Sequence, residues 1–182
     1  MKLVDRLVDV SLKPISRKNH LLAKGLPIFV FFFFFPVLFF IIPDFVLDQW
    51  FRLPTLLTAT TRLFFGGILI LLGIWFLLWT IKAQREIGKG TPMPLIATQK
   101  LVVEKPYSFT RNPLAFGLIN FYCGISIAIG SVSSLVVISL FSITILAYIK
   151  FIEEKELAQR YGDAYLAYKE MTPFLFPRRS KR

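Results

Sequence analysis

Between Leu114 and Ile149 the chain reads LAFGLINFYCGISIAIGSVSSLVVISLFSITILAYI, without one charged side chain. Gly130 and Ser131 divide this stretch into two apolar segments, 114–129 and 132–149. Because lipid offers no hydrogen-bonding partner, the backbone of such segments must bond within itself, as only helices and closed barrels can. Nothing in the stretch alternates as barrel strands do. The sequence therefore predicts two membrane spans that form a helical hairpin with a tight turn.

Two further uncharged segments precede the predicted hairpin, Leu26–Ile42 and Leu63–Ile81. At 1.5 Å per helical residue, segments of this length reach roughly 24–29 Å, close to the hydrocarbon core of about 30 Å. Pro36 lies inside the first segment, where its missing N–H is expected to kink the helix. Of the 182 residues 55% are hydrophobic, and the mean hydropathy is +0.61. We expect an all-α membrane bundle of about four transmembrane helices.

The basic residues predict how this bundle is oriented. Of 22 lysines and arginines, 20 precede the first span, lie between the second and third spans, or follow the fourth. Because positively charged loops stay in the cytoplasm, both termini and the second loop are expected there. Residues 1–25 are predicted to be a basic segment at the membrane surface, and residues 26–182 a single membrane domain. The net charge of +11 then reflects topology and attraction to anionic lipid.

The composition also argues against several functions. With one cysteine, Cys123, and one histidine, His20, neither an internal disulfide nor a zinc site of cysteines or paired histidines can form, and no metal is expected. The spans carry none of the acidic or basic residues typical of proton-coupled transporters. Nucleic acid is not an expected partner, because the basic residues flank the spans rather than forming one stripe. The partners expected are the lipid bilayer and a lipophilic substrate.

The remaining polar residues gather in two cytoplasmic segments, Ala83–Pro113 and Glu153–Pro177. If the fourth helix continues to Arg160, the adjacent carboxylates of Glu153 and Glu154 lie within about 6–8 Å of its membrane end. Gly162 is then the expected helix end. Such a pair of acids suits a cationic ligand held at the bilayer surface. The alternative is that both acids are simply solvated.

In their order and spacing, the motifs of these segments resemble the superfamily of isoprenylcysteine carboxyl methyltransferases and phospholipid N-methyltransferases. The matching residues are Gly88-Lys89-Gly90-Thr91-Pro92, Leu101-Val102, Pro106-Tyr107, Arg111-Asn112-Pro113, Gly117, Glu153-Glu154, Leu157, Tyr161-Gly162, Tyr165 and Tyr168. They cover roughly the C-terminal half of the chain. The resemblance implies an integral-membrane enzyme that transfers a methyl group from S-adenosylmethionine to a lipophilic acceptor, either a prenylcysteine-like carboxylate or a lipid amine.

The same resemblance implies a cofactor pocket within residues 88–177, between the second cytoplasmic loop and the end of the last helix. Glu153 or Glu154 would pair with the cofactor's ammonium, and the Tyr107 ring would attract its sulfonium. Arg111, or backbone N–H groups near Asn112, would receive its carboxylate. No catalytic base is assigned. The full set of implied cofactor-binding residues is Gly88, Gly90, Gln99, Lys100, Leu101, Val102, Tyr107, Arg111, Asn112, Pro113, Leu114, Ala115, Glu153 and Glu154.

Three positions depart from the pattern of these families. Asn112 replaces the usual histidine, Ala115 replaces an aromatic residue, and Ile149 stands where prenylcysteine enzymes have an arginine. The last departure argues against prenylcysteine as the substrate more than against the cofactor site. Two other functions stay open. One is a membrane reductase of the sterol C14 type that uses NADPH, and the other is a non-enzymatic membrane protein whose acidic pair forms a partner surface.

Overall fold

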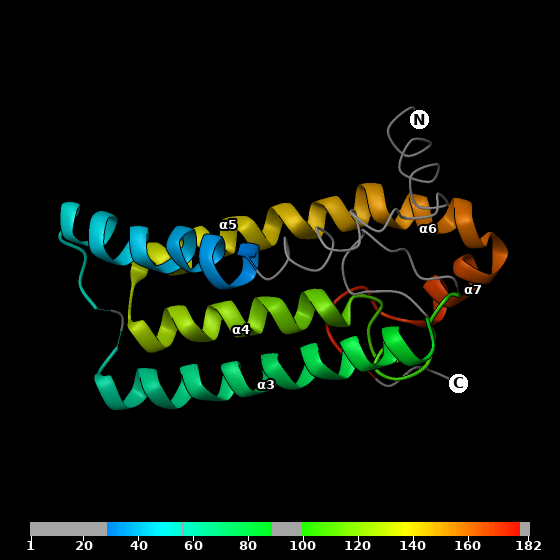
Figure 1. Ribbon diagram of the computed structural model, residues 1–182, viewed down its shortest axis with the longest axis horizontal. Coiled ribbons are helices and arrows are strands. Elements are labelled where there is room, and N and C mark those ends of the chain that lie inside the picture. The colour runs from blue at the N-terminus through cyan, green and yellow to red at the C-terminus, as the bar shows by residue number, and fades with distance from the viewer. Residues whose placement is uncertain (1–28, 56, 89–99, 179–182) are drawn as a thin grey trace. The chain divides into compact units, whose positions relative to one another are not determined.

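Helices and turns make up the described part of the chain, and it contains no strand (Figure 1). The computed structural model describes residues 29–55, 57–88 and 100–178. The all-α prediction is confirmed for these residues, whereas segment 1–25, Gly90 and Gln99 lie outside them. In chain order the elements are η1 (Val30–Phe34), η2 (Val37–Ile41), η3 (Pro43–Asp48), α3 (Ala59–Glu86), α4 (Pro113–Ile129), α5 (Val132–Tyr148), η4 (Ile149–Glu153), α6 (Glu154–Tyr161) and α7 (Asp163–Met171).

Two of the four predicted spans are long and apolar enough to cross a membrane. These are α3, with 28 residues, and the helix Val132–Tyr161, which has 30 residues and comprises α5, η4 and α6. The predicted third span corresponds to α4, which is apolar but has 17 residues. The predicted first span is helical where it is described, in the short π-helical pieces η1 and η2, and Pro36 between them has helical backbone angles. Four spans and the hairpin stay predictions.

The residues fall into two compact units. The site unit combines Trp75–Gly117 with Ile145–Arg182, and the apolar unit contains the described residues up to Ile74 together with Leu118–Thr144. The helices α3, α4 and α5 each contribute residues to both. The site unit holds the described polar segments, and the apolar unit holds most of the predicted membrane residues.

Within the apolar unit, α3 and α4 approach each other at glycines. A Cβ atom on Gly73 would lie 2.5 Å from the backbone nitrogen of Phe121, and one on Gly66 would lie 2.7 Å from the carbonyl oxygen of Gly124. The obstacles are backbone atoms, which no side-chain rotation can move away. Small residues that let two backbones come this close are typical of helix packing in membranes.

The turn between α4 and α5 is tight, as predicted, and charged side chains from earlier segments cap both helix ends. Gly130 has a φ of +88°, which favours glycine. Asp48 Oδ1 accepts the Ser133 N–H at 2.9 Å, and Arg62 Nη1 donates to the Ile129 carbonyl oxygen at 2.9 Å. An anion at the start of α5 and a cation at the end of α4 both complement the helix dipoles.

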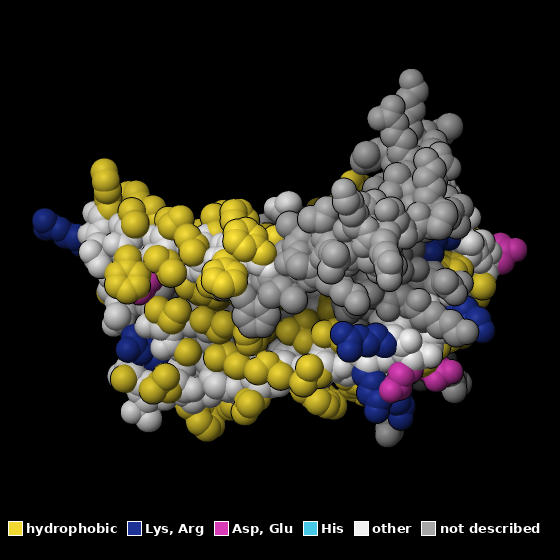
Figure 2. All heavy atoms as spheres, viewed as in Figure 1, with side chains coloured by type: hydrophobic (Ala, Val, Ile, Leu, Met, Phe, Trp, Pro, Cys, Tyr) yellow, Lys and Arg dark blue, Asp and Glu magenta, His cyan; other side chains and the backbone are white. Residues whose placement is uncertain are grey.

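Hydrophobic side chains are exposed along much of α3 (Figure 2). They include Leu63, Phe64, Leu71, Trp75 and Leu78, whose exposed fractions all exceed one half. Figure 2 also shows charged side chains toward the C-terminal end of this helix. Soluble monomers rarely expose so large an apolar surface. The distribution suits a helix that contacts lipid along its length and meets water at its end.

Candidate functional site

The site unit places its polar side chains on the end of α3, on residues 100–112, on the helix formed by η4 and α6, and on α7. The last helix continues beyond the apolar stretch to Tyr161, so the condition that it reaches Arg160 is met. Gly162 ends it, with a φ of +55°, and α7 begins at the next residue. The predicted helix end at Gly162 is therefore confirmed.

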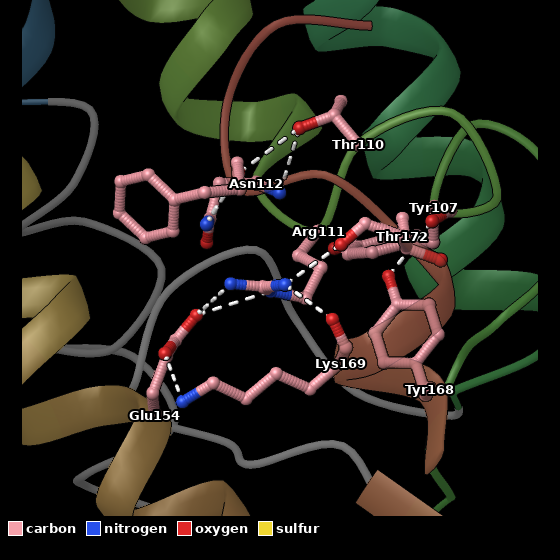
Figure 3. A network of polar contacts seen from close by, with 9 residues as sticks. Tyr107, Thr110, Arg111, Asn112, Glu154, Tyr168, Lys169 and Thr172 are labelled. Atoms are coloured by element: carbon pink, nitrogen blue, oxygen red, sulfur yellow. Dashed lines mark hydrogen bonds and ion pairs between the residues drawn. The ribbon is translucent and has the colours of Figure 1, made fainter. Parts of the chain in front are cut away.

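Arg111 is the centre of a polar network (Figure 3). Its Nε and Nη2 donate to Glu154 Oε1 at 3.1 and 2.8 Å, and its Nη1 donates to the carbonyl oxygens of Lys169 and Thr172, both at 2.7 Å. The Nζ of Lys169 lies 2.7 Å from the second carboxylate oxygen of Glu154. The Glu154 side chain is 4% exposed. All three guanidinium nitrogens and both carboxylate oxygens thus have partners within the protein.

The C-terminal segment lies alongside the residues around Arg111. The Arg111 backbone N–H donates to the Pro173 carbonyl at 2.9 Å. The Thr110 hydroxyl and the Asn112 side-chain amide both donate to the Phe174 carbonyl, at 3.1 and 2.8 Å. These acceptors are backbone oxygens, which any residue supplies, so sequence reasoning could not find them. Arg111 and Asn112 hold the C-terminal segment to the loop that precedes α4.

Glu153 differs from Glu154 in the partners that its carboxylate has. It is half-buried, and no hydrogen bond or ion pair joins its carboxylate to any side chain in the described part of the chain. The charge of Glu154 is balanced by Arg111 and Lys169, and Glu156 pairs with Arg160 at 3.4 Å. No cation within the described residues balances a charge on Glu153, and burial, together with the nearby charges of Glu156 and Glu154, raises the pKa of this carboxyl to about 7.

Tyr107 is fixed at both ends. Gln84 Nε2, from α3, donates to the Tyr107 hydroxyl at 2.5 Å, and the Tyr168 hydroxyl donates to the Tyr107 carbonyl oxygen at 2.7 Å. Burial raises the pKa of Tyr107 well above its usual range, and the negative charge of Glu153 acts in the same direction. The phenol therefore stays neutral.

Two tyrosines of α7 line the same region of the unit. Tyr165 and Tyr168 are both buried, and their ring centroids are 6.2 Å apart. Burial raises the pKa of both hydroxyls above the usual range. The aromatic residues of this segment thus serve as neutral packing and hydrogen-bonding groups, with Tyr168 supporting Tyr107.

Gln84 is a residue that sequence reasoning missed. A single amide near the end of an apolar helix has no spacing that would single it out. Its Oε1 is buried and has no hydrogen-bond partner in the part of the chain that the structure describes. Buried polar atoms without partners are uncommon in native proteins.

The other predicted cofactor residues that the structure describes lie near the two ends of the loop. Gly88, Val102, Pro113 and Ala115 are buried, Leu101 and Leu114 are half-buried, and Lys100 is exposed. The network of Figure 3 brings together Tyr107, Arg111, Asn112 and Glu154 of the predicted set. Among the residues that the structure describes, no three histidine, cysteine or acidic side chains are grouped so that they could hold a metal ion.

The sequence matches the family described as phospholipid methyltransferase over residues 61–164, more than half of the chain. The chain belongs to the phospholipid methyltransferase family. No curated protein that was compared matches it. The match confirms the resemblance stated from the motifs, and this family of methyltransferases is membrane-associated, in agreement with the two apolar helices.

The part of this phospholipid methyltransferase family member that matches includes Gln84, Tyr107, Arg111, Glu153 and Glu154. It ends within α7, before the residues whose carbonyls accept the bonds of Arg111 and Asn112. The contacts that hold the C-terminal segment in place thus join matched and unmatched parts of the chain.

Proposed function

We propose that this protein is an integral-membrane enzyme that transfers the methyl group of S-adenosylmethionine to a lipophilic acceptor at the cytoplasmic surface. The family match supports methyl transfer to a lipid. The observation that carries the cofactor assignment is the Glu153 carboxyl, which has no hydrogen bond or ion pair among the described residues and acts electrostatically on Tyr107. A lipid amine is the favoured acceptor, because the apolar Ile149 and the exposed Lys150 leave no arginine to hold a substrate carboxylate.

The described residues fit the positive charges of this cofactor. Glu153 would hold its ammonium by a charge-assisted hydrogen bond, and the Tyr107 ring would attract its sulfonium. Residues 100–102 would border the cofactor on the loop side. S-adenosylmethionine supplies a methyl group bound to a positively charged sulfur, which makes the methyl carbon susceptible to attack by a nucleophile.

Three residues would help to position the cofactor: Arg111, Asn112 and Glu154. Their hydrogen bonds are already used to join the loop to the last helix and to the C-terminal segment. Holding reactants in alignment can contribute about 7–11 kcal/mol to lowering a reaction barrier. An amine acceptor has to be neutral to react, and apolar surroundings favour its neutral form. The proposal therefore requires no dedicated base.

We further propose that the chain crosses the membrane four times, with both termini and the site in the cytoplasm and residues 26–182 acting as one domain. The basic residues support this orientation. The contacts of Asp48 and Arg62 with the turn between α4 and α5 also support it, since four spans would place those loops on one side of the bilayer. A lipophilic acceptor would then reach the site laterally from the bilayer.

Cofactor binding by protein reconstituted in lipid nanodiscs tests the proposal. We expect calorimetric titration to detect S-adenosylmethionine binding, and Glu153→Gln to weaken it by about tenfold or more, as for loss of a hydrogen bond to a charged group. The matched control is Glu170→Gln on α7, which changes an exposed acid and should leave binding unchanged. A wild-type protein that does not bind the cofactor, or a Glu153 variant that binds it normally, would refute the proposal.

The acceptor is identified by transfer of a labelled methyl group. Wild-type protein is incubated with methyl-labelled S-adenosylmethionine and membranes containing phosphatidylethanolamine, and the lipids are extracted. Label in the amine lipid supports the favoured acceptor. Label found instead in added prenylcysteine would show that the acceptor is a carboxylate.

A further inference from the structure

Phe176 is exposed although the segment that carries it is fixed on both sides. The residue is 76% exposed. Two positions before it, the Phe174 carbonyl accepts a hydrogen bond from the Asn112 side-chain amide at 2.8 Å. Two positions after it, the Arg178 backbone N–H donates to the Phe109 carbonyl at 3.0 Å. A backbone that is bonded to residues 109–112 therefore presents this ring to its surroundings.

Residues 109–112 lie where two apolar helices end. Asn112 directly precedes Pro113, the first residue of α4. The Phe109 ring packs against Trp79 of α3, with the two ring centroids 5.9 Å apart. Tryptophan gathers at membrane surfaces, where the apolar core meets water. With α4 in the bilayer, as the four proposed spans require, Phe176 lies at the level of the lipid headgroups.

Basic side chains are exposed around the same backbone. Lys105 is exposed, and its Nζ lies 5.7 Å from the centroid of the Phe109 ring. Arg178 is also exposed, and neither side chain forms an ion pair with a carboxylate of the described residues. The one acid within the sequence 100–112 is Glu104, whereas three more basic residues occur in the sequence 179–182. Positive charge thus occurs together with an exposed aromatic ring.

We infer that Lys105, Phe176 and Arg178 form a lipid-binding patch for anionic phospholipids at the cytoplasmic surface of the membrane. The two basic side chains would contact lipid phosphates, and the Phe176 ring would insert among the acyl chains below them. A lipid surface is a partner that offers both a negatively charged layer and an apolar layer beneath it. Bound lipid would also hold in place the segment whose backbone oxygens accept hydrogen bonds from Arg111. The inference rests on the proposed membrane position of α4 and is independent of methyl transfer.

Fluorescence of the full chain in nanodiscs of different charge tests this inference. The chain carries Cys123→Ser and Ser180→Cys, and an environment-sensitive fluorophore is attached to the cysteine at the second position. The nanodiscs contain either phosphatidylcholine alone or equal parts of phosphatidylcholine and phosphatidylglycerol. We expect emission at shorter wavelength in the anionic nanodiscs. This shift should be lost in about 1 M salt, where charges are screened beyond about 3 Å.

Substitutions within the lipid-binding patch separate the contribution of charge from that of the ring. Lys105→Gln and Arg178→Gln should each reduce the ratio of lipid-bound to free segment by about fivefold. Phe176→Ser should also reduce the shift, whereas Phe176→Leu keeps an apolar side chain and should retain most of it. The matched control is Lys155→Gln, which removes an exposed positive charge on α6 outside the patch and should leave the shift unchanged.

Equal emission in the two kinds of nanodisc would overturn the inference. So would a shift that Lys155→Gln reduces as much as Lys105→Gln does, or one that Phe176→Ser leaves intact. Neither the cofactor nor a methyl acceptor takes part in this experiment. Its failure would therefore leave the proposed methyl transfer unaffected, and failure of cofactor binding would leave the lipid-binding patch unaffected.

Discussion

Replacement of Glu154 by glutamine is expected to destabilise the protein strongly. The Glu154 side chain is 4% exposed, and its two oxygens accept two hydrogen bonds from Arg111 and one from Lys169. Glutamine has nearly the same shape, but it carries no charge and only one acceptor oxygen. Its NH2 group would face either Arg111 or Lys169, both of which are donors.

The size of the effect follows from how buried each partner is. Removing one member of a buried ion pair costs about 3–5 kcal/mol, because the other charge is left without a partner. Arg111 is 12% exposed and belongs to this case. Lys169 is 42% exposed and can turn to water, so its share is below about 1 kcal/mol. Since the glutamine oxygen keeps part of the Arg111 interaction, we expect a net loss of about 2–4 kcal/mol.

For a chain of this size, such a loss lowers the Tm by about 4–16 °C. Cys123, the single cysteine, provides the assay: a thiol-reactive fluorophore labels it as the helices open during heating. Glu153→Gln is the closest control, because it makes the same chemical change one residue away, at a carboxylate that has no hydrogen bond or ion pair with the described residues. It should melt no lower than the wild type, because it breaks no interaction and removes a carboxyl whose charged form is disfavoured by burial. An unchanged Tm for Glu154→Gln, or an equal loss for both variants, would refute the reasoning.

Three further predictions concern the packing and the tyrosines. Gly73→Ala should cost about 1–3 kcal/mol, because the added Cβ meets the Phe121 backbone. Gly67→Ala, where a Cβ meets open space, should melt like the wild type in the same Cys123 assay. Asp48→Ala should cost about 0.5–2 kcal/mol through loss of the cap on α5, measured in that assay beside the exposed control Asp163→Ala. Burial raises the pKa of Tyr107, Tyr165 and Tyr168 above 10. Their contribution to the free energy of unfolding should therefore be fully present below pH 10 and decline above it. Their absorbance at 295 nm should rise only as the protein unfolds. Because the chain has six tyrosines, a rise in absorbance that corresponds to more than three of them while the protein is still folded would contradict the last of these.

The helices were the most predictable part of the fold, because the membrane imposes a strong requirement on sequence. A segment in lipid has to be apolar, and its backbone has to form hydrogen bonds within the segment. Stretches of sequence without charged residues therefore predict the positions of α3, α4 and α5. The residues at which the helices begin and end were less predictable. The second predicted span was 63–81, whereas α3 extends from Ala59 to Glu86, since charged residues at helix ends can reach water without interrupting the helix. The close approach of α3 and α4 depends on which face each glycine occupies after packing, which the sequence leaves open.

The candidate site was predicted as two polar segments, and the structure joins them through Arg111 and Glu154. The sequence could not distinguish Glu154 from Glu153, because both have the same side chain and the same local surroundings. It likewise could not reveal that Arg111 is saturated by backbone carbonyls. Such acceptors carry no residue identity. The unpaired oxygen of Gln84 is visible only when the partners of each buried atom are known.

The separation of roles between Glu153 and Glu154 follows from helix geometry. Neighbouring residues of a helix differ in direction by about 100°, so one carboxylate can point to Arg111 while the other lies near Tyr107. Arg111 cannot balance both, because its donors are used by Glu154 and by two carbonyl oxygens. A chain with a net charge of +11 thus keeps one half-buried carboxylate without a balancing cation among its described residues. Such a carboxyl either takes up a proton, as its raised pKa of about 7 indicates, or is held in its charged form by a bound cation, which is why Glu153, rather than the better-connected Glu154, is the acid we assign to the ligand.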